Sequence, residues 1–397
     1  MDNNVYYIWL STVFGTASRA AGELLRRFPG AKEIYDCEEY PKDIRLTQKQ
    51  RRMLEDKDLT ASLAILSECR KKDISVLGYH DPLFPERLRA INDPPVMLYY
   101  RGKLKDLNSE FLVSVVGTRS MTEYGGKITE YFTGEFASAG AVVVSGMASG
   151  IDSAAHRGCL ARGGYTVAIL GTAIDRAYPY ENEKLYHKII KKGVVMSEHA
   201  PGSPYVRNCF PVRNRLIAGI SNATLVTEAG ERSGALITAR DAIMQGKEVY
   251  ALPGLSGSKQ SVGTNMLLQK GVRLAYRPSD VLATAELMYP DKIRITAESY
   301  RTERTEDLIP LLPTETRPSS ETGVEEKHNV YSFENIGKLE PEEVTVITAL
   351  KNAGGGLYID EVVAASGLDA GLVMSTLTVL EVYGVVSQKN DGRYLLV

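Results

Sequence analysis

The stretch FLVSVVGTRSMTEYGGK, residues 111–127, combines two patterns that together predict one β-α unit. It opens with a short apolar run that ends at Gly117, and a helical pattern follows the glycine. Such a run is typical of a strand buried in a parallel sheet, because helices cover both faces of that kind of sheet.

The same pattern recurs up to about residue 280 and predicts a doubly wound parallel sheet of α/β class. Loops at the carboxyl ends of the strands bind the ligands of such sheets. The further runs are AVVVSG at 141–146, TVAILG at 166–171, VVMSE at 194–198, ATLVTEAG at 223–230, EVYALPG at 248–254 and VRLAY at 272–276.

The flanking segments predict three further parts. Apolar residues at helical spacing predict a small all-α N-terminal unit, and a polar, proline-rich segment without periodicity predicts a linker. Three helices followed by a hairpin predict a C-terminal winged helix-turn-helix. The expected domains are a helical domain over 1–78, the doubly wound domain over 79–288, the linker over 289–338 and the winged helix over 339–397.

Charge separates the two larger parts, although the whole 397-residue chain has a formal net charge of only -2. Residues 111–280 hold nineteen Lys or Arg against thirteen Asp or Glu, whereas residues 339–397 hold three against eight. The presumed recognition helix, DAGLVMSTLTVLEVYG, has no Lys or Arg, which DNA-reading helices use to contact phosphates and bases. We therefore expect an anion site in the sheet domain and a protein-binding role for the winged helix.

Composition excludes several classes of site. Four cysteines without C-x-x-C spacing predict neither a zinc site nor a disulfide framework. The loops follow neither of the common nucleotide-binding glycine patterns, so we expect no cofactor. No run of about eighteen apolar residues occurs and the first residues lack the layout of a secretory signal. The expectation is a cytoplasmic protein with no metal and no membrane partner.

Two glycine-rich loops are candidates for an anion site. A glycine at a strand end lets the backbone approach an anion, and the next helix offers unpaired N–H groups. In the second loop, Asp152 or Ser153 is expected to cap the helix. The alternative, that the glycines only allow tight packing, stays open. The candidate residues are Gly117, Thr118 and Arg119 in the first loop, and Ser145 and Gly146 in the second.

Two later loops add aromatic, cationic and small polar residues. In FPVRNRLIAG, residues 210–219, the arginines would bind successive phosphates and Phe210 would stack on an unpaired base, which suits single-stranded nucleic acid. In the structural alternative, Phe210 fills a core and the arginines are solvated. The candidates in these loops are Asn208, Phe210, Arg213, Asn214, Arg215, Ser233 and Gly234.

Candidate catalytic residues are few. Asp152 and His156 are four residues apart and would suit a metal or an acid-base pair, but no third ligand has suitable spacing, so we expect a helix cap and a buried histidine. Glu228, at a strand end, is the best remaining acid or base. Alone it does not make a catalytic site, and we expect no enzyme.

These loops, in this order, resemble the DNA-processing protein A family (DprA or Smf) of bacterial natural transformation. The resemblance covers residues 83–282, and it extends to the lead-in HDPLFPERLRAINDPPVMLYYRG at 80–102. Its motifs are VVGTRSMTEYG, VVSGMASGIDSAAHRG, AILGTAIDRAYPYEN, SEHAPG, FPVRNRLIAG, EAGERSGALITA, ALPG and GTNMLLQKG.

The resemblance implies an extended Rossmann-like core that binds single-stranded DNA, forms a homodimer and helps to load RecA recombinase, without catalysis. Gly117, Thr118 and Arg119 match the family's phosphate loop, and the segment from Asn208 to Arg215 matches its second DNA-contacting segment. Ser149 departs from the pattern, because an arginine is common there. The alternative is a Rossmann-like nucleotide phosphoribohydrolase, but the P-G-G-x-G-T segment of those enzymes is missing.

Overall fold

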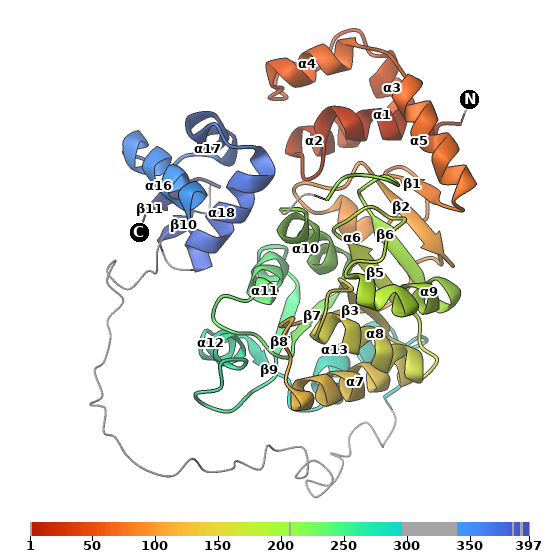
Figure 1. The fold of residues 1–397 in the computed structure, drawn as a ribbon, viewed down its shortest axis with the longest axis vertical. Coiled ribbons are helices and arrows are strands. Elements are labelled where there is room, and N and C mark those ends of the chain that lie inside the picture. The colour runs from red at the N-terminus through yellow and green to blue at the C-terminus, as the bar shows by residue number, and fades with distance from the viewer. Residues whose placement is uncertain (1, 206–207, 296–339, 383–384, 390–391, 397) are drawn as a thin grey trace, which may run out of the picture. The chain divides into compact units, whose positions relative to one another are not determined.

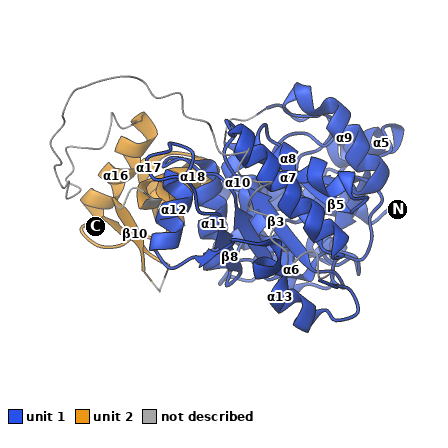
Figure 2. Cartoon of the chain, turned by 90° about the horizontal axis from the view of Figure 1, so that it is seen from below, with its two compact units in different colours: residues 1–302 blue, residues 303–397 orange. Residues whose placement is uncertain are grey.

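The computed structural model describes residues 2–205, 208–295, 340–382, 385–389 and 392–396. The chain divides into two compact units, residues 1–302 and residues 303–397 (Figure 2). Each unit has its own hydrophobic core and is described by itself.

Five helices form the N-terminal part of the first unit (Figure 1). The first is almost entirely apolar and is buried against the others and against the edge of the sheet. Lys57 packs against two aromatic rings of this part. Its Nζ lies 5.3 Å from the centre of the Trp9 ring and 5.2 Å from that of Tyr35. The helices are α1 (Asn4–Phe14), α2 (Arg19–Arg27), α3 (Ala31–Asp36), α4 (Gln48–Glu55) and α5 (Thr60–Lys71).

A nine-stranded sheet forms the centre of the unit, in the order β1-β2-β6-β5-β4-β3-β7-β8-β9. All seven predicted runs form strands, β3 to β9, and these are parallel to one another. The strands are β1 (Ser75–Gly78), β2 (Met97–Gly102), β3 (Leu112–Val116), β4 (Val142–Ser145), β5 (Thr166–Leu170), β6 (Val194–Ser197), β7 (Ala223–Val226), β8 (Glu248–Ala251) and β9 (Arg273–Leu274).

The sequence analysis did not predict β1 and β2. They pair antiparallel with each other, and β2 pairs antiparallel with β6, so they extend the parallel sheet at one edge. β1 lies within residues 1–78, which we expected to be helical throughout.

Helices cover both faces of the sheet, as a doubly wound fold requires (Figure 1). Val113 and Val115 pack with the helices of one face, and Leu112 and Val116 pack with the core on the other. On the first face lie α7 (Glu123–Ser138), α8 (Ile151–Ala161) and α13 (Pro278–Met288), and on the second α6 (Glu86–Arg89), α10 (Cys209–Ile220) and α11 (Gly234–Met244). The remaining elements are η1 (Tyr180–Asn182), α9 (Glu183–Lys192) and α12 (Val262–Gln269).

The direction of strand order reverses between β3 and β7. From β3 the chain proceeds outward through β4 and β5 to β6, and it then returns to β7 on the other side of β3. Ligands of open α/β sheets bind outside the carboxyl ends of the strands at such a switch point. The loops after β3 and β7 lie there, with the loop after β4 beside them.

The second unit is a winged helix, as predicted. Its core contains Val346, Val362, Val373 and Leu377. Asp391, half of the predicted hairpin turn, lies outside the described residues. The elements are α16 (Pro341–Ala353), α17 (Ile359–Ser366), α18 (Ala370–Val382), β10 (Val386–Gln388) and β11 (Tyr394–Leu396).

The first residues of the predicted linker belong to the sheet unit. Residues 289–295 pack against the sheet unit: Ile293 is buried, and the Nζ of Lys292 lies 3.1 Å from the Glu110 carboxylate. The rest of the predicted linker, 296–338, lies outside the described residues.

No single helix in the described ranges has the length and hydropathy to cross a membrane. The bent pair formed by α17 and residues 370–381 meets that test of length and composition only when its two helices are taken together.

Candidate nucleic-acid interface

The glycines of the first loop allow close packing at the switch point. A Cβ atom at Gly117 would lie 2.5 Å from the Ile151 side chain and 2.8 Å from the Glu228 carbonyl oxygen. The Thr118 amide donates to that same carbonyl at 2.7 Å. The packing role that the sequence analysis left open is therefore present, and it leaves the next residue, Arg119, exposed.

The N-terminus of α7 already holds a carboxylate of the protein. The Thr122 amide donates to Glu228 Oε2 at 2.9 Å, and the Thr122 hydroxyl donates to Oε1 at 2.5 Å. Glu228 is buried there, at the positive end of the helix, where an anion is stabilised. The predicted anion cradle at this helix is therefore occupied by Glu228, whose carboxylate is hydrogen-bonded to Thr122, the N-cap residue of α7.

The second loop is also satisfied internally. Asp152 accepts hydrogen bonds from the amides of Gly146 at 3.1 Å and Ala148 at 3.4 Å, and burial raises the pKa of its carboxyl. The Ser153 hydroxyl donates to the Ala148 carbonyl. The prediction that Asp152 or Ser153 caps α8 is wrong, because Gly150 is the N-cap residue and both side chains bind the loop instead.

Two other polar residues of this region face the protein interior. Ser145 is fully buried and its hydroxyl donates to the Val115 carbonyl at 2.7 Å, so it does not face a ligand. His156 Nδ1 lies 2.7 Å from the Thr166 hydroxyl, and burial lowers the His156 pKa to about 3. Among the described residues no cluster of three or more His, Cys, Asp or Glu is placed to hold a metal ion.

Arg213 lies inside the protein, because α10 already begins at Cys209 and the stretch FPVRNRLIAG is helical rather than a loop. Its Nη1 donates to the carbonyl of Gly146 at 2.6 Å and to that of Ile169. Only 5% of the residue is exposed, and burial lowers its pKa to about 10. Arg213 therefore connects the ends of β4 and β5 instead of offering its charge to solvent.

Arg215 is buried and forms ion pairs with two carboxylates. Its Nη2 donates to both carboxylate oxygens of Glu198 at 2.7 Å, and its Nε lies 3.3 Å from Asp93 Oδ2. Burial raises the pKa of Glu198, while Arg215 lowers it. The expectation that Arg213 and Arg215 each hold a phosphate at the surface therefore does not fit their burial, and both are placed to position α10.

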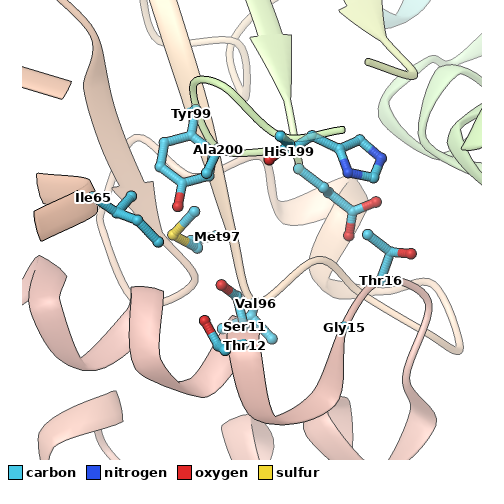
Figure 3. Close-up of a pocket in the computed structure, with 12 residues that line it drawn as sticks. Ser11, Thr12, Gly15, Thr16, Ile65, Val96, Met97, Tyr99, His199 and Ala200 are labelled. Atoms are coloured by element: carbon cyan, nitrogen blue, oxygen red, sulfur yellow. The ribbon is translucent and has the colours of Figure 1, made fainter. Parts of the chain in front are cut away.

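Glu198 also contributes to a cavity of about 360 Å³ between α1 and the sheet (Figure 3). The cavity mixes apolar walls with hydroxyl groups. The other lining residues are Ser11, Thr12, Gly15, Thr16, Ile65, Val96, Met97, Tyr99, His199, Ala200 and Ser203.

The exposed part of the site combines one cation with three aromatic rings. The Arg119 Cζ lies 5.0 Å from the centre of the Phe210 ring. The Tyr178 ring lies 5.2 Å and the Tyr205 ring 5.9 Å from that of Phe210, centre to centre. Tyr178 is 39% exposed and Tyr205 is 52% exposed. Tyr178, Tyr205 and Phe210 are called the aromatic cluster below.

The two tyrosines were not among the site residues predicted from the sequence. Tyr178 lies within the AYPYEN segment and Tyr205 precedes FPVRNRLIAG by a few residues. Aromatic residues in loops near a candidate phosphate-binding segment could have predicted that they stack on bases. Their contact with Phe210, however, depends on how the segment between β5 and η1 meets the start of α10 and the residues before it.

The remaining candidates surround this exposed part. Asn208 is the N-cap residue of α10, and Asn214 Nδ2 donates to the Gly234 carbonyl at 3.3 Å. The Ser233 hydroxyl caps α11 by accepting from the Ala235 amide at 3.3 Å. A Cβ atom at Gly234 would meet open space, so the backbone there is accessible.

Residues 75–286 match the family described as DNA recombination-mediator protein A, and residues 335–392 match the DprA winged helix domain. The chain belongs to this recombination-mediator family. Protein Smf of Synechocystis is 34% identical over 332 residues, which cover 83% of this chain and 82% of that protein. DNA processing protein DprA of Streptococcus pneumoniae is 41% identical over 206 residues, 52% of this chain and 72% of that protein.

Solved structures of DprA proteins have the same fold as this chain. The X-ray structure of Streptococcus pneumoniae DprA has a TM-score of 0.58 and 31% identity, covering 70% of this chain and 97% of that chain. The Helicobacter pylori DprA structure, described with a single-stranded DNA binding mode, has a TM-score of 0.50 and 30% identity, covering 54% and 97%. Family membership and the Rossmann-like fold with a winged helix are thus confirmed.

Proposed function

We propose that this recombination-mediator protein binds single-stranded DNA at Arg119 and the aromatic cluster. The observation that carries the proposal is the exposed Arg119 guanidinium over the Phe210 ring, with two exposed tyrosine rings beside it. A cation next to aromatic faces binds a phosphate and an unpaired base together, with little preference for sequence.

The unpaired state of the DNA follows from the chemistry of the rings. Bases in a duplex stack on one another, so their faces are not available to protein side chains, whereas bases of a single strand can stack on tyrosine or phenylalanine. Arg119 supplies the exposed charge. Arg213 and Arg215 act as positioning residues, because they hold α10 and hence Phe210 in place.

The proposal is tested by titrating the protein with single-stranded and duplex oligonucleotides at two salt concentrations. We expect tighter binding to the single strand, and Arg119→Ala should lower the slope of log affinity against log salt by about 0.7. The matched control is Arg162→Ala, which removes the same charge at the far end of α8, where Arg162 pairs with Glu135. Equal slopes for both variants would reject Arg119 as a phosphate contact.

As part of the same proposal, the protein acts in the cytoplasm during natural transformation and helps to load RecA onto the bound strand. Family membership supports this role. The measurement is the rate at which RecA forms filaments on single-stranded DNA that a single-strand-binding protein already covers. We expect the full-length protein to increase that rate and the Arg119→Ala variant to increase it less.

We also propose a homodimer. One edge of the sheet ends at β9, where Leu274 is 51% exposed and the following Tyr276 is 58% exposed. An exposed strand edge with apolar side chains is a surface that a second copy can cover. Light scattering should report about twice the chain mass of 43.6 kDa, and a monomer at micromolar concentration would contradict the dimer.

The proposed function does not include catalysis. The enzyme alternative needs a carboxylate free to act on a substrate, and Glu228 is engaged with Thr122 at the N-terminus of α7. Incubation with nucleoside monophosphates should release no free base. Release that is abolished by Glu228→Gln would instead favour the phosphoribohydrolase alternative.

A further inference from the structure

Helix α9, EKLYHKIIKK, presents a basic stripe to solvent. Lys184, His187, Lys188 and Lys191 are exposed and are spaced i, i+3, i+4 and i+7, so they share one face of the helix. The opposite face, with Leu185, Tyr186 and Ile189, is buried against the sheet. The three lysines of this face, Lys184, Lys188 and Lys191, form the basic stripe.

Several cations on the surfaces near the basic stripe face a carboxylate, unlike the lysines of the stripe. Arg157 lies 2.8 Å from Glu130, and Arg162 lies 3.6 Å from Glu135. Lys72, at the end of α5, lies 2.7 Å from Asp175. Within the ranges that the structure describes, the three lysines of the stripe make no ion pair with any carboxylate.

Of the two nearby carboxylates, one is hydrogen-bonded to another residue and the other stabilises the N-terminus of α9. Glu181 accepts a hydrogen bond from the Ser149 hydroxyl at 2.7 Å, and Glu183 lies in the first turn of α9, where negative charge is stabilised. The stripe therefore keeps an uncompensated positive charge in a chain whose net charge is -2. Uncompensated lysines on one helix face are suited to a polyanion.

The start of α9 is fixed close to the proposed DNA site. Asn182, the N-cap residue of α9, donates through Nδ2 to the Met147 carbonyl at 2.9 Å and to the Ser153 hydroxyl at 2.8 Å, both in the segment after β4. Tyr178 of the aromatic cluster is four residues before Asn182. The helix then continues to Gly193 at the opposite end of the sheet, where β6 begins, beside β5 (Figure 1).

We propose that the basic stripe is a second contact surface for the phosphodiester backbone of the strand held at Arg119. The inference rests on the proposed single-strand binding and extends it from the loops along the side of the molecule. From Lys184 to Lys191 the helix rises about 10 Å, which is long enough to accompany more than one phosphate. Lysines act here as point charges, so the contact is independent of sequence.

The test compares short and long oligothymidylates, of roughly 4 and roughly 20 nucleotides, because single-strand sites span lengths of this order. The variant is Lys184→Gln, Lys188→Gln and Lys191→Gln together in the full chain. Binding of the short probe should be unchanged. The long probe should bind more weakly, with a salt slope reduced by about 2, or about 0.7 for each phosphate contact.

Two controls separate the stripe from net charge and from misfolding. Replacing Lys49, Arg51 and Arg52 on α4 by Gln removes the same charge from another exposed helix and should leave the slope unchanged. Replacing the three stripe lysines by Arg keeps the charge and should restore both affinity and slope.

Three results would overturn the inference. They are an unchanged slope for the stripe variant, an equal loss of slope for the α4 variant, and a wild-type protein that gains no affinity from the longer probe. Failure of the proposed function is distinct, because it would appear as Arg119→Ala leaving the short probe's affinity and slope unchanged.

Discussion

Three arginines that look equivalent in the sequence have three different environments. Arg119 is exposed over an aromatic ring, Arg213 binds two strand-end carbonyls, and Arg215 binds two carboxylates. A buried guanidinium is retained only when hydrogen bonds and opposite charges offset the loss of water. Burial therefore gives Arg213 and Arg215 a structural task, and Arg119 is the arginine of the three that is placed to meet a ligand directly.

The aromatic cluster should contribute affinity without salt dependence. We expect Phe210→Ala to weaken binding of single-stranded DNA by about 1 to 3 kcal/mol and to leave the salt slope nearly unchanged, because stacking releases no counterions. Tyr178→Ala and Tyr205→Ala should act in the same direction. Tyr358→Ala, which removes an exposed tyrosine of the winged helix, is the control. A change in slope for Phe210→Ala would show that the variant disturbs Arg119 rather than a stacked base.

The carboxylates around Arg215 should make stability depend on pH. Burial raises the pKa of Asp241 to about 7, with Asp93 adding to the rise and Arg240 and Arg215 opposing it. Since the unfolded value is about 3.9, the folded protein binds the extra proton, and its stability falls as pH rises from about 4 to about 7. The fall is at most about 1.4 kcal/mol per pH unit.

Urea unfolding at about pH 5 and about pH 8 measures this effect. The Asp241→Asn variant should lose less stability between the two pH values than the wild-type protein does. An identical loss in both proteins would mean that Asp241 does not titrate in this window.

Gly150, in the turn before α8, should affect both protein stability and the binding of single-stranded DNA at Arg119. Gly150 has φ +76°, and a Cβ atom there would overlap the carbonyl oxygens of Thr118 and Arg119. Gly163, at the other end of the helix, has φ +72° but would place its Cβ in open space. Both alanine variants carry backbone strain of about 1 to 2 kcal/mol, but only Gly150→Ala should displace the Arg119 loop.

Thermal unfolding and single-strand titration of the two variants provide the comparison. We expect Gly150→Ala to be less stable than Gly163→Ala and to bind more weakly. If both variants bind like the wild-type protein, the position of the Arg119 loop does not depend on Gly150.

Elements with a strong local pattern could be predicted from the sequence. The runs that became β3 to β8 are apolar because both faces of those strands are covered, and that cause is visible in each run by itself. β9, at the edge of the sheet, is exposed. β1 and β2 lie outside the β-α alternation, and their pairing joins segments about twenty residues apart. FPVRNRLIAG was predicted as a loop, whereas α10 already begins at Cys209 and holds Pro211 in its first turn, where proline is tolerated.

The candidate site was less predictable than the fold. Residue types and their loops were evident, but the burial of Arg213 and Arg215 depends on which carbonyls and carboxylates the sheet brings to them. The aromatic cluster likewise brings the segment between β5 and η1, with Tyr178, to the start of α10 and the residues before it, with Phe210 and Tyr205. Such contacts arise from tertiary packing, for which periodicity carries no signal.

The charge distribution of the whole chain predicts that the winged helix contributes little to strand binding. Residues 339–397 hold three basic against eight acidic residues, and the chain shortened to residues 1–301 keeps Arg119 and the aromatic cluster. Titration should therefore show that the shortened chain retains most of the single-strand affinity. A loss as large as that caused by Arg119→Ala would contradict a protein-binding role for the winged helix.

Glu228 determines the charge at the N-terminus of α7. The α7 N-terminus at the switch point, where a nucleotide's phosphates would ordinarily bind, is already neutralised from within. In the proposed function, a free mononucleotide would meet a carboxylate there, whereas a long strand would bind Arg119 and the aromatic cluster. We therefore expect ATP in excess to compete poorly with bound oligothymidylate, and Glu228→Gln to make the competition stronger. In a cell rich in nucleotides, this built-in anion would let the protein ignore the monomers and respond to the polymer.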